Sequence, residues 1–213
     1  MPRKQMNAAA DKAASGKKTL LLSVLMSSPG PLVVGLGLLA GKSSTQLADF
    51  FRRSAELLAI ILSFAVYCIT NGKKPCTAQQ KQRLERITNG FVGAAMAVGG
   101  IIMLVLALFF ESEEKGNVIP GLAIALLGVI ANTLFWRKYT RLNKQEPNAI
   151  LAVQSRLYRA KALVDGCVTL ALLSVVVLPG TAVSYYLDLV GSVIVALYLA
   201  WSGYKTIRSV REA

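Results

Sequence analysis

Two pairs of oppositely charged residues interrupt otherwise apolar stretches of this 213-residue sequence. In each pair a cation precedes an acid by four residues: Arg52 with Glu56, and Lys161 with Asp165. Residues four apart lie on the same face of an α-helix, so each pair presents both charges to one side. A neutral set of four such charges is typical either of a substrate or proton site or of a structural clamp made of two salt bridges.

The helices that carry these pairs are predicted to lie in a membrane. Apolar residues make up 54% of the chain and charged residues 16%, a balance typical of a protein solvated by lipid. At roughly 20 residues per span the length fits six transmembrane helices, so the predicted fold is an all-α integral membrane bundle. We expect a basic N-terminal segment at 1–19, a six-helix domain at 20–207 and a short tail at 208–213. The expected spans are 20–40, 45–71, 90–110, 118–136, 148–178 and 182–204.

The second and fifth spans have to include their charged stretches. Downstream of Glu56 and of Asp165, the uncharged runs are too short for a hydrocarbon core of roughly 30 Å at about 1.5 Å per residue. Both helices therefore extend backwards, the second from near Thr45 and the fifth from near Asn148. Measured from the outer ends, Glu56 then lies about 16 Å deep and Asp165 about 21 Å deep. At these depths the two pairs can meet inside the bundle.

The distribution of basic residues predicts the orientation of the bundle. The chain holds 24 Lys and Arg against 11 Asp and Glu. Seventeen of these cations fall before the first span, after the last span or in the segments 71–88 and 137–149, against two in the opposite loops. Basic loops stay in the cytoplasm, so we expect both termini there. The basic excess thus reflects topology in a lipid bilayer, and no nucleic-acid partner is expected.

Two further features of the spans concern helix geometry. Pro29 and Pro31 in the first span predict a kink. Small residues favour close approach of helices, and they recur in the first and third spans. They are Gly35, Gly37, Ala95 and Gly99.

Other polar residues in or near the spans are weaker candidates. Asn132, on the fourth span, is expected to make an interhelical hydrogen bond. Arg156 and Arg159 lie close enough to the cytoplasmic side for their side chains to reach lipid headgroups. The secondary candidates for substrate or ion binding are Asp49, Asn132 and Asp188, and Arg53 is weaker.

No arrangement typical of an enzyme is found in the sequence. The chain has no His, which removes the usual general base, and no Gly-rich phosphate loop follows a strand. Cys68, Cys76 and Cys167 are isolated and lack metal-ligand spacing. Glu56 and Asp165 are the groups that would serve an intramembrane metal, if any did. We therefore expect neither an enzyme nor a bound cofactor.

Three stretches of the sequence carry recognisable motifs. They are SSTQLADFFRRSAELLAII, IPGLAIALLGVIANTLFWRKYTRLNKQEPNAILAVQSRLYRAKALVDG and YYLDLVGSVIVALYLAWSGYKTIRSV, which together cover nearly half of the chain. In these stretches the protein resembles the transmembrane domain of the cation diffusion facilitator family. The resemblance implies a six-helix homodimer in the plasma membrane or a prokaryotic inner membrane. It also implies export of zinc and related divalent metals in exchange for protons.

The sequence departs from that family at the metal site. The resemblance implies a metal between the second and fifth helices, each of which supplies His or Asp four residues before an Asp. Here Arg52 and Lys161 occupy the first of those positions, while Glu56 and Asp165 hold the second. A protonated guanidinium or ammonium offers no lone pair to a metal, and two cations repel a divalent ion. A counterpart of the family's cytoplasmic metal-sensing domain is not expected either.

The sequence therefore predicts a secondary transporter related to proton-coupled cation exporters, with a small ion or small molecule as its substrate. Arg52, Glu56, Lys161 and Asp165 are the predicted binding residues, and the two acids are predicted to exchange protons. The two cations would bind an anionic portion of the substrate or act as built-in countercations. The alternative is a non-transporting structural or regulatory relative in which the four charges form a buried clamp.

Overall fold

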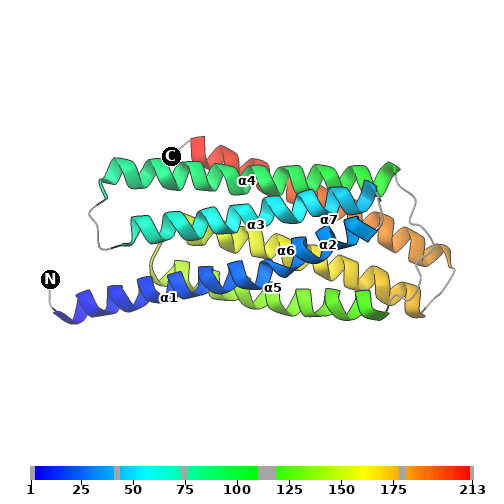
Figure 1. Ribbon diagram of the computed structural model, residues 1–213, viewed down its shortest axis with the longest axis horizontal. Coiled ribbons are helices and arrows are strands. Elements are labelled where there is room, and N and C mark those ends of the chain that lie inside the picture. The colour runs from blue at the N-terminus through cyan, green and yellow to red at the C-terminus, as the bar shows by residue number, and fades with distance from the viewer. Residues whose placement is uncertain (1–2, 41–43, 73–75, 110–118, 178–180, 212–213) are drawn as a thin grey trace.

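The computed structural model describes residues 3–40, 44–72, 76–109, 119–177 and 181–211, and every regular element within them is an α-helix. The helices run antiparallel to one another in an elongated bundle (Figure 1). α1 begins and α7 ends at the same end of that bundle, the end that the loop charges predict to be cytoplasmic. The helices are α1 (Arg3–Ser27), α2 (Pro29–Ala40), α3 (Ser44–Thr70), α4 (Ala78–Phe109), α5 (Ile119–Gln145), α6 (Ala149–Val177) and α7 (Ala182–Arg211).

The first two helices form one broken span. α1 ends at Ser27 and α2 begins at Pro29. Proline has no N–H group to donate to the carbonyl four residues earlier, and its ring clashes with that turn. The predicted kink is thus confirmed as a break. With α1 and α2 counted together, the described helices make six spans, which confirms the predicted six-helix membrane bundle.

The helices that carry the charge pairs begin where their short apolar runs require. α3 begins at Ser44 and α6 at Ala149, beside the predicted starts near Thr45 and Asn148. At the end of the bundle where α1 begins, α4 and α5 extend well past the predicted spans as helix. Lys, Arg, Gln and Glu dominate these extensions. These residues are good helix formers, and their polar side-chain ends favour contact with water.

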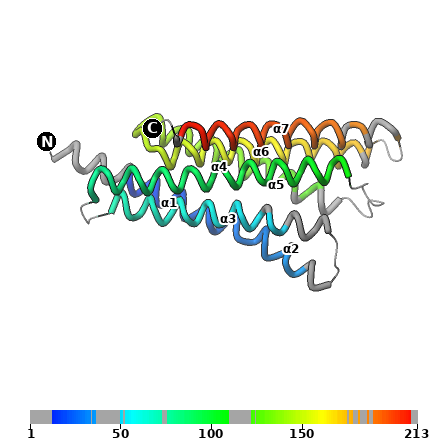
Figure 2. The backbone as a smooth tube through the Cα atoms, turned by 90° about the horizontal axis from the view of Figure 1, so that it is seen from above, coloured from blue at the N-terminus to red at the C-terminus, as the bar shows by residue number. Residues whose placement is uncertain are grey.

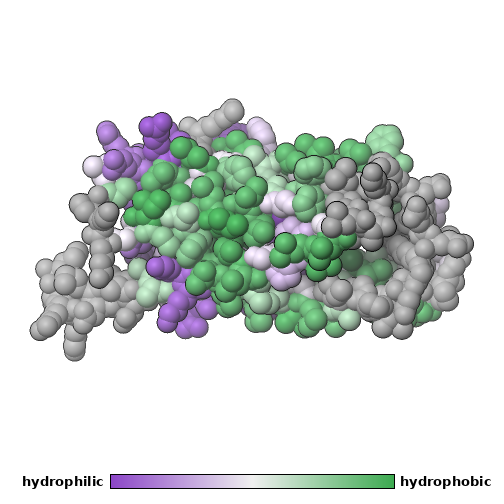
Figure 3. Space-filling view, in the orientation of Figure 1, coloured by the Kyte–Doolittle hydropathy of each residue, from purple (hydrophilic) through white to green (hydrophobic). Residues whose placement is uncertain are grey.

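The outer surface of the bundle is largely apolar. Among the described residues, three windows are both long and apolar enough to cross a membrane: Arg53–Thr70, Ala78–Phe109 and Leu189–Ser209. Figure 3 shows a broad apolar band across one face of the molecule, with hydrophilic residues gathered towards the end where the chain begins. Leucine, isoleucine and valine side chains remain exposed along the helices. A surface of this kind is suited to lipid.

The helices divide into closely and loosely packed neighbours. α4 packs along α7 and α5 packs along α6, whereas α3 and α6 meet over a short stretch only. In Figure 2, α2 and α3 lie on one side of the bundle and α6 and α7 on the other. We call the short contact of α3 with α6 the α3–α6 seam. Both predicted charge pairs belong to the helices of this seam.

Glycines bring the backbones of α4 and α7 together. A Cβ placed on Gly203 would lie 2.6 Å from the carbonyl oxygen of Gly93. One placed on Gly100 would lie 2.6 Å from the backbone nitrogen of Ala200. The sequence correctly predicted close approach in the third span. However, these contacts are made by Gly93, Gly100 and Gly203, and none of the three was among the residues named for it.

Candidate functional site

An ion pair joins the two helices of the seam. The Nζ atom of Lys161 on α6 lies 3.6 Å from Oε2 of Glu56 on α3. The Lys161 side chain is 17% exposed and that of Glu56 is 8% exposed. The described partners thus come from different helices, although the sequence pattern places each charge beside another on its own helix. At this burial the pair is shielded from water, and each charge depends on the other for stabilisation.

The ammonium of Lys161 has two further neighbours. It donates a hydrogen bond to Oγ of Ser27 on α1, at 3.5 Å. It also lies 5.2 Å from the centre of the Tyr158 ring, one turn earlier on α6. A carboxylate, a hydroxyl and an aromatic face therefore surround the cation, and all three stabilise positive charge.

The second acid of the site is held by the neighbouring helix. Nδ2 of Asn132 on α5 donates a hydrogen bond to Oδ2 of Asp165, at 2.6 Å. Gly128, one turn before Asn132, leaves room for the carboxylate, because a Cβ there would lie 2.5 Å from the same oxygen. The interhelical hydrogen bond expected of Asn132 is therefore present. Asp165 consequently has a fixed position one turn beyond Lys161.

A row of hydroxyl groups leads from the ion pair towards the beginning of α1. Oγ of Ser27 lies 3.2 Å from the Tyr158 hydroxyl. The Tyr139 hydroxyl donates to Oγ of Ser23 at 2.8 Å, and it lies 3.3 Å from the Thr19 carbonyl oxygen. We call these five residues the hydroxyl ladder.

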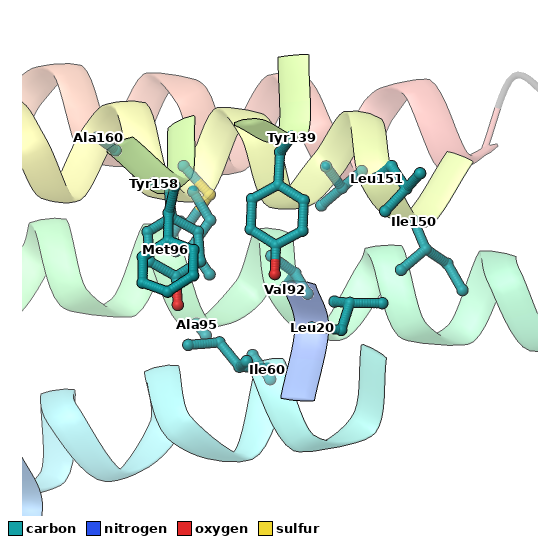
Figure 4. Packing of buried hydrophobic residues seen from close by; sticks show 14 of the residues in the cluster. Leu20, Ile60, Val92, Ala95, Met96, Tyr139, Ile150, Leu151, Tyr158 and Ala160 are labelled. Carbon is teal, nitrogen blue, oxygen red and sulfur yellow. The ribbon is translucent and has the colours of Figure 1, made fainter. Parts of the chain in front are cut away.

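Aromatic stacking holds the two tyrosines of the ladder. The Tyr139 and Tyr158 rings stack with their centres 5.4 Å apart, and Phe135 lies 5.0 Å from Tyr158. Both tyrosines are almost fully buried. Figure 4 shows them within the core, near Leu20 of α1 and Ile60 of α3. Rings packed in this way have little freedom to turn, so their hydroxyl groups keep fixed positions.

A second polar link crosses the α3–α6 seam nearer the end of the bundle where α1 begins. Nε2 of Gln154 donates a hydrogen bond to Oγ of Ser63, at 2.8 Å. Gln154 and Lys161 are seven residues apart, as are Ser63 and Glu56, which is the register of two antiparallel helices. The amide oxygen of Gln154, Oε1, is buried and has no hydrogen-bond partner among the described atoms. The seam thus carries a buried hydrogen-bond acceptor between the ion pair and the end of the bundle where α1 begins.

The other residues predicted from the sequence lie around this site or outside the described part. The Arg53 guanidinium lies beside Gly30 of α2. Arg159 faces outward and stacks over Trp136 and Tyr198, at 5.7 Å and 6.0 Å from the ring centres. Arg156 is exposed. The side chains of Arg52, Asp49 and Asp188 lie outside the described residues.

Sequence reasoning missed the hydroxyl ladder and the space made by Gly128. Thr19, Ser23 and Ser27 recur every four residues, so one polar face of the first span was available as a signal. No sequence pattern indicates the role of Tyr158, because its contacts with α1 and α5 depend on the tertiary fold.

The described side chains do not assemble a typical metal site. No group of three or more His, Cys, Asp or Glu residues comes together among them. The cation that faces Glu56 is instead the ammonium of Lys161. A tethered positive charge thus neutralises the Glu56 carboxylate.

Comparison with known proteins gives one family. The sequence matches the cation efflux transmembrane domain over residues 20–213. No curated protein matches the chain. The matched range includes all of α2 to α7 and every charged residue of the seam. It also includes Ser23 and Ser27 of α1.

Proposed function

Because the chain belongs to the cation efflux family of membrane transporters, we propose that it is a proton-coupled secondary transporter in which a mobile cation competes with Lys161 for Glu56. The observation that carries the proposal is the 3.6 Å contact between the Lys161 ammonium and the Glu56 carboxylate across the α3–α6 seam. A carboxylate already neutralised by a tethered cation binds a second cation poorly. Loss of the Lys161 proton would free it.

Charge balance favours a monovalent cation. In the proposed exchange one proton leaves Nζ of Lys161 while one cation binds Glu56, so a monovalent ion leaves the charge of the site unchanged. A divalent ion would add a positive charge to a poorly solvated site, where uncompensated charge is costly. Arg52, four residues before Glu56 in the sequence, adds a charge that does not titrate in proteins. Asp165, held by Asn132, would supply a second oxygen ligand.

The hydroxyl ladder supports an exit for the proton towards the cytoplasm. The Lys161 ammonium already donates to Ser27, which lies beside the Tyr158 hydroxyl. From Ser27 the ladder follows α1 towards its cytoplasmic beginning. Release of the proton on that side as the cation enters from it is the sense required for export. The short contact of α3 with α6 would let the seam open to either side as helix groups rock about it.

The test is a flux measurement in liposomes that contain the purified protein and a pH-sensitive dye in the lumen. Sodium, potassium, zinc or manganese is added outside in turn. We expect sodium or potassium to drive proton movement, Glu56→Gln to abolish it, and Lys161→Gln to leave cation flux uncoupled from protons. Glu85→Gln and Lys205→Gln are the matched controls, since both residues lie outside the site. Proton movement driven by zinc or manganese alone would show that the substrate is divalent.

A structural clamp is the second candidate, because the ion pair ties together two helices that otherwise touch little. A clamp predicts a folded protein without flux of any tested ion, and loss of thermal stability in Glu56→Gln. Exchanging the charges, with Glu56→Lys and Lys161→Glu in one protein, would restore the stability of a clamp. In a transporter the same exchange would restore folding without restoring flux. From the family resemblance, the proposal also includes a homodimer in the cell membrane.

A further inference from the structure

A groove beside the cytoplasmic part of α5 lies apart from the transport site. It is a shallow depression of about 400 Å³, widely open to the surroundings and lined by residues of α5 alone. Its position, at the junction between the apolar part of α5 and the basic part, is where lipid headgroups are expected. The lining residues are Trp136, Arg137, Thr140, Arg141, Lys144 and Gln145.

The groove carries three positive charges and no acid. Arg137, Arg141 and Lys144 follow one another at the spacing of a single helix face, and all three are exposed. In the described part of the chain, no carboxylate forms a salt bridge with any of them. The nearest acid in the sequence, Glu146, lines a different pocket with Tyr67. The fold thus separates the acid of this segment from its cations.

The floor of the groove is fixed by contacts with α6 and α7. The hydroxyl of Thr140 lies 2.7 Å from that of Ser155 on α6. The Trp136 ring lies under the guanidinium of Arg159, which also covers Tyr198 of α7. These contacts hold the indole at the level where the charges begin, as in the aromatic belts of membrane proteins.

The same face of α5 continues as an apolar stripe towards the membrane centre. Leu127, Ile130 and Leu134 precede Arg137 at steps of three or four residues, and each is more than half exposed, at 66%, 51% and 61%. An acyl chain can pack along such a stripe, whereas an inorganic anion has no apolar part that would contact it.

We propose that this face of α5 binds an anionic phospholipid, with its acyl chain on the apolar stripe and its phosphate between Arg137, Arg141 and Lys144. Guanidinium groups bind phosphate oxygens in pairs of parallel hydrogen bonds. A ligand for this face needs an apolar part next to an anionic part, as in a phospholipid. The site is independent of Glu56 and Lys161, so its test does not depend on transport.

The experiment is native mass spectrometry of the protein in neutral detergent, with phosphatidylglycerol, phosphatidylcholine or inorganic phosphate added. We expect phosphatidylglycerol to bind at least about tenfold more tightly than phosphatidylcholine, since each basic residue near an anionic surface contributes about a further fivefold. The double variant Arg137→Gln/Arg141→Gln should lose this preference. The matched control, Lys138→Gln/Lys205→Gln, removes the same charge from the same end outside the groove and should keep it. Equal binding of both lipids, or equal loss in the control, would overturn the proposal.

A second measurement places the lipid. In a Trp201→Phe protein, Trp136 is the remaining tryptophan. Phosphatidylglycerol with brominated acyl chains should then quench its fluorescence at lower lipid fractions than brominated phosphatidylcholine, and inorganic phosphate should not relieve the quenching. Identical quenching by both lipids, or full displacement by phosphate, would show that no lipid headgroup is selected there.

Discussion

The contact of α4 with α7 and the α3–α6 seam are two different solutions to holding helices together in lipid. In the first, Gly93, Gly100 and Gly203 let the backbones touch, and the association depends on van der Waals packing. In the second, Glu56 and Lys161 link helices that meet over a short stretch. Packed backbones have one low-energy arrangement, whereas an ion pair can be replaced by a proton or another cation. In the proposed transporter, the α4–α7 contact stays rigid while the ion pair of the α3–α6 seam is exchanged.

Substituting the glycines at the contact of α4 with α7 should have the largest effect on stability. Gly100→Ala combined with Gly203→Ala places two Cβ atoms against backbone that cannot move aside, and we expect a loss of more than about 3 kcal/mol or failure to assemble. The measurement is the thermal midpoint of the purified protein in detergent. Gly166→Ala is the matched control, because nothing lies within 4 Å of a Cβ there. It should stabilise the helix by up to about 1 kcal/mol. Similar midpoints for all three proteins would remove the distinction between the two contacts.

Breaking the ion pair between Glu56 and Lys161 should have the second-largest effect on stability. Glu56→Gln leaves the buried ammonium of Lys161 without its carboxylate, and we expect a loss of about 2–3 kcal/mol. Adding Lys161→Met should recover most of that stability, because a neutral, well-packed seam needs no partner charge. The midpoint would thus recover while proton-coupled flux stays absent. If the double variant were as unstable as Glu56→Gln alone, the seam would not be a simple charge pair.

Filling the space beside Asp165 should have a smaller effect on stability. Gly128→Ala places a Cβ 2.5 Å from the carboxylate oxygen, so the side chain must shift and its hydrogen bond with Asn132 weakens. We expect a loss of about 1 kcal/mol and a reduction in cation flux. Asn132→Ala, which removes the donor and adds no bulk, should match it in flux. A normal flux in both variants would separate Asp165 from the transported ion.

The smallest effect is expected in the hydroxyl ladder. Ser27→Ala removes one membrane hydrogen bond, which is worth roughly 0.6 kcal/mol, so the thermal midpoint should barely change. Proton movement in liposomes should nevertheless slow, because the hydroxyl that accepts from Lys161 is gone. Ser209→Ala, on the last turns of α7 and away from the site, is the control. An unchanged proton rate would show that the ladder is structural.

The sequence was sufficient for the spans and the charged helices, because both follow from one-dimensional information. A hydrocarbon core of fixed thickness determines how far α3 and α6 must extend, whereas the side of the termini, which loop charge predicts, stays a prediction. Partner choice is different. The four-residue spacing predicts that the two charge pairs can meet across the second and fifth helices, but it does not predict that Lys161 contacts Glu56 while Asp165 contacts Asn132. Such contacts depend on helix rotation and register, which a single sequence does not contain.

Pro29 and Pro31 change the main chain beside the ion pair. Neither has an N–H group, so the carbonyl oxygens of Leu25 and Ser27 receive no donor from the residue four positions later. Facing hydrocarbon, each would cost several kcal/mol. Ser27 also provides the hydroxyl that meets Lys161, so one of these oxygens lies at the mouth of the site. The break therefore leaves a main-chain acceptor close to the ion pair. In the proposed transporter, this oxygen would replace part of the hydration shell that a cation gives up on entering the membrane.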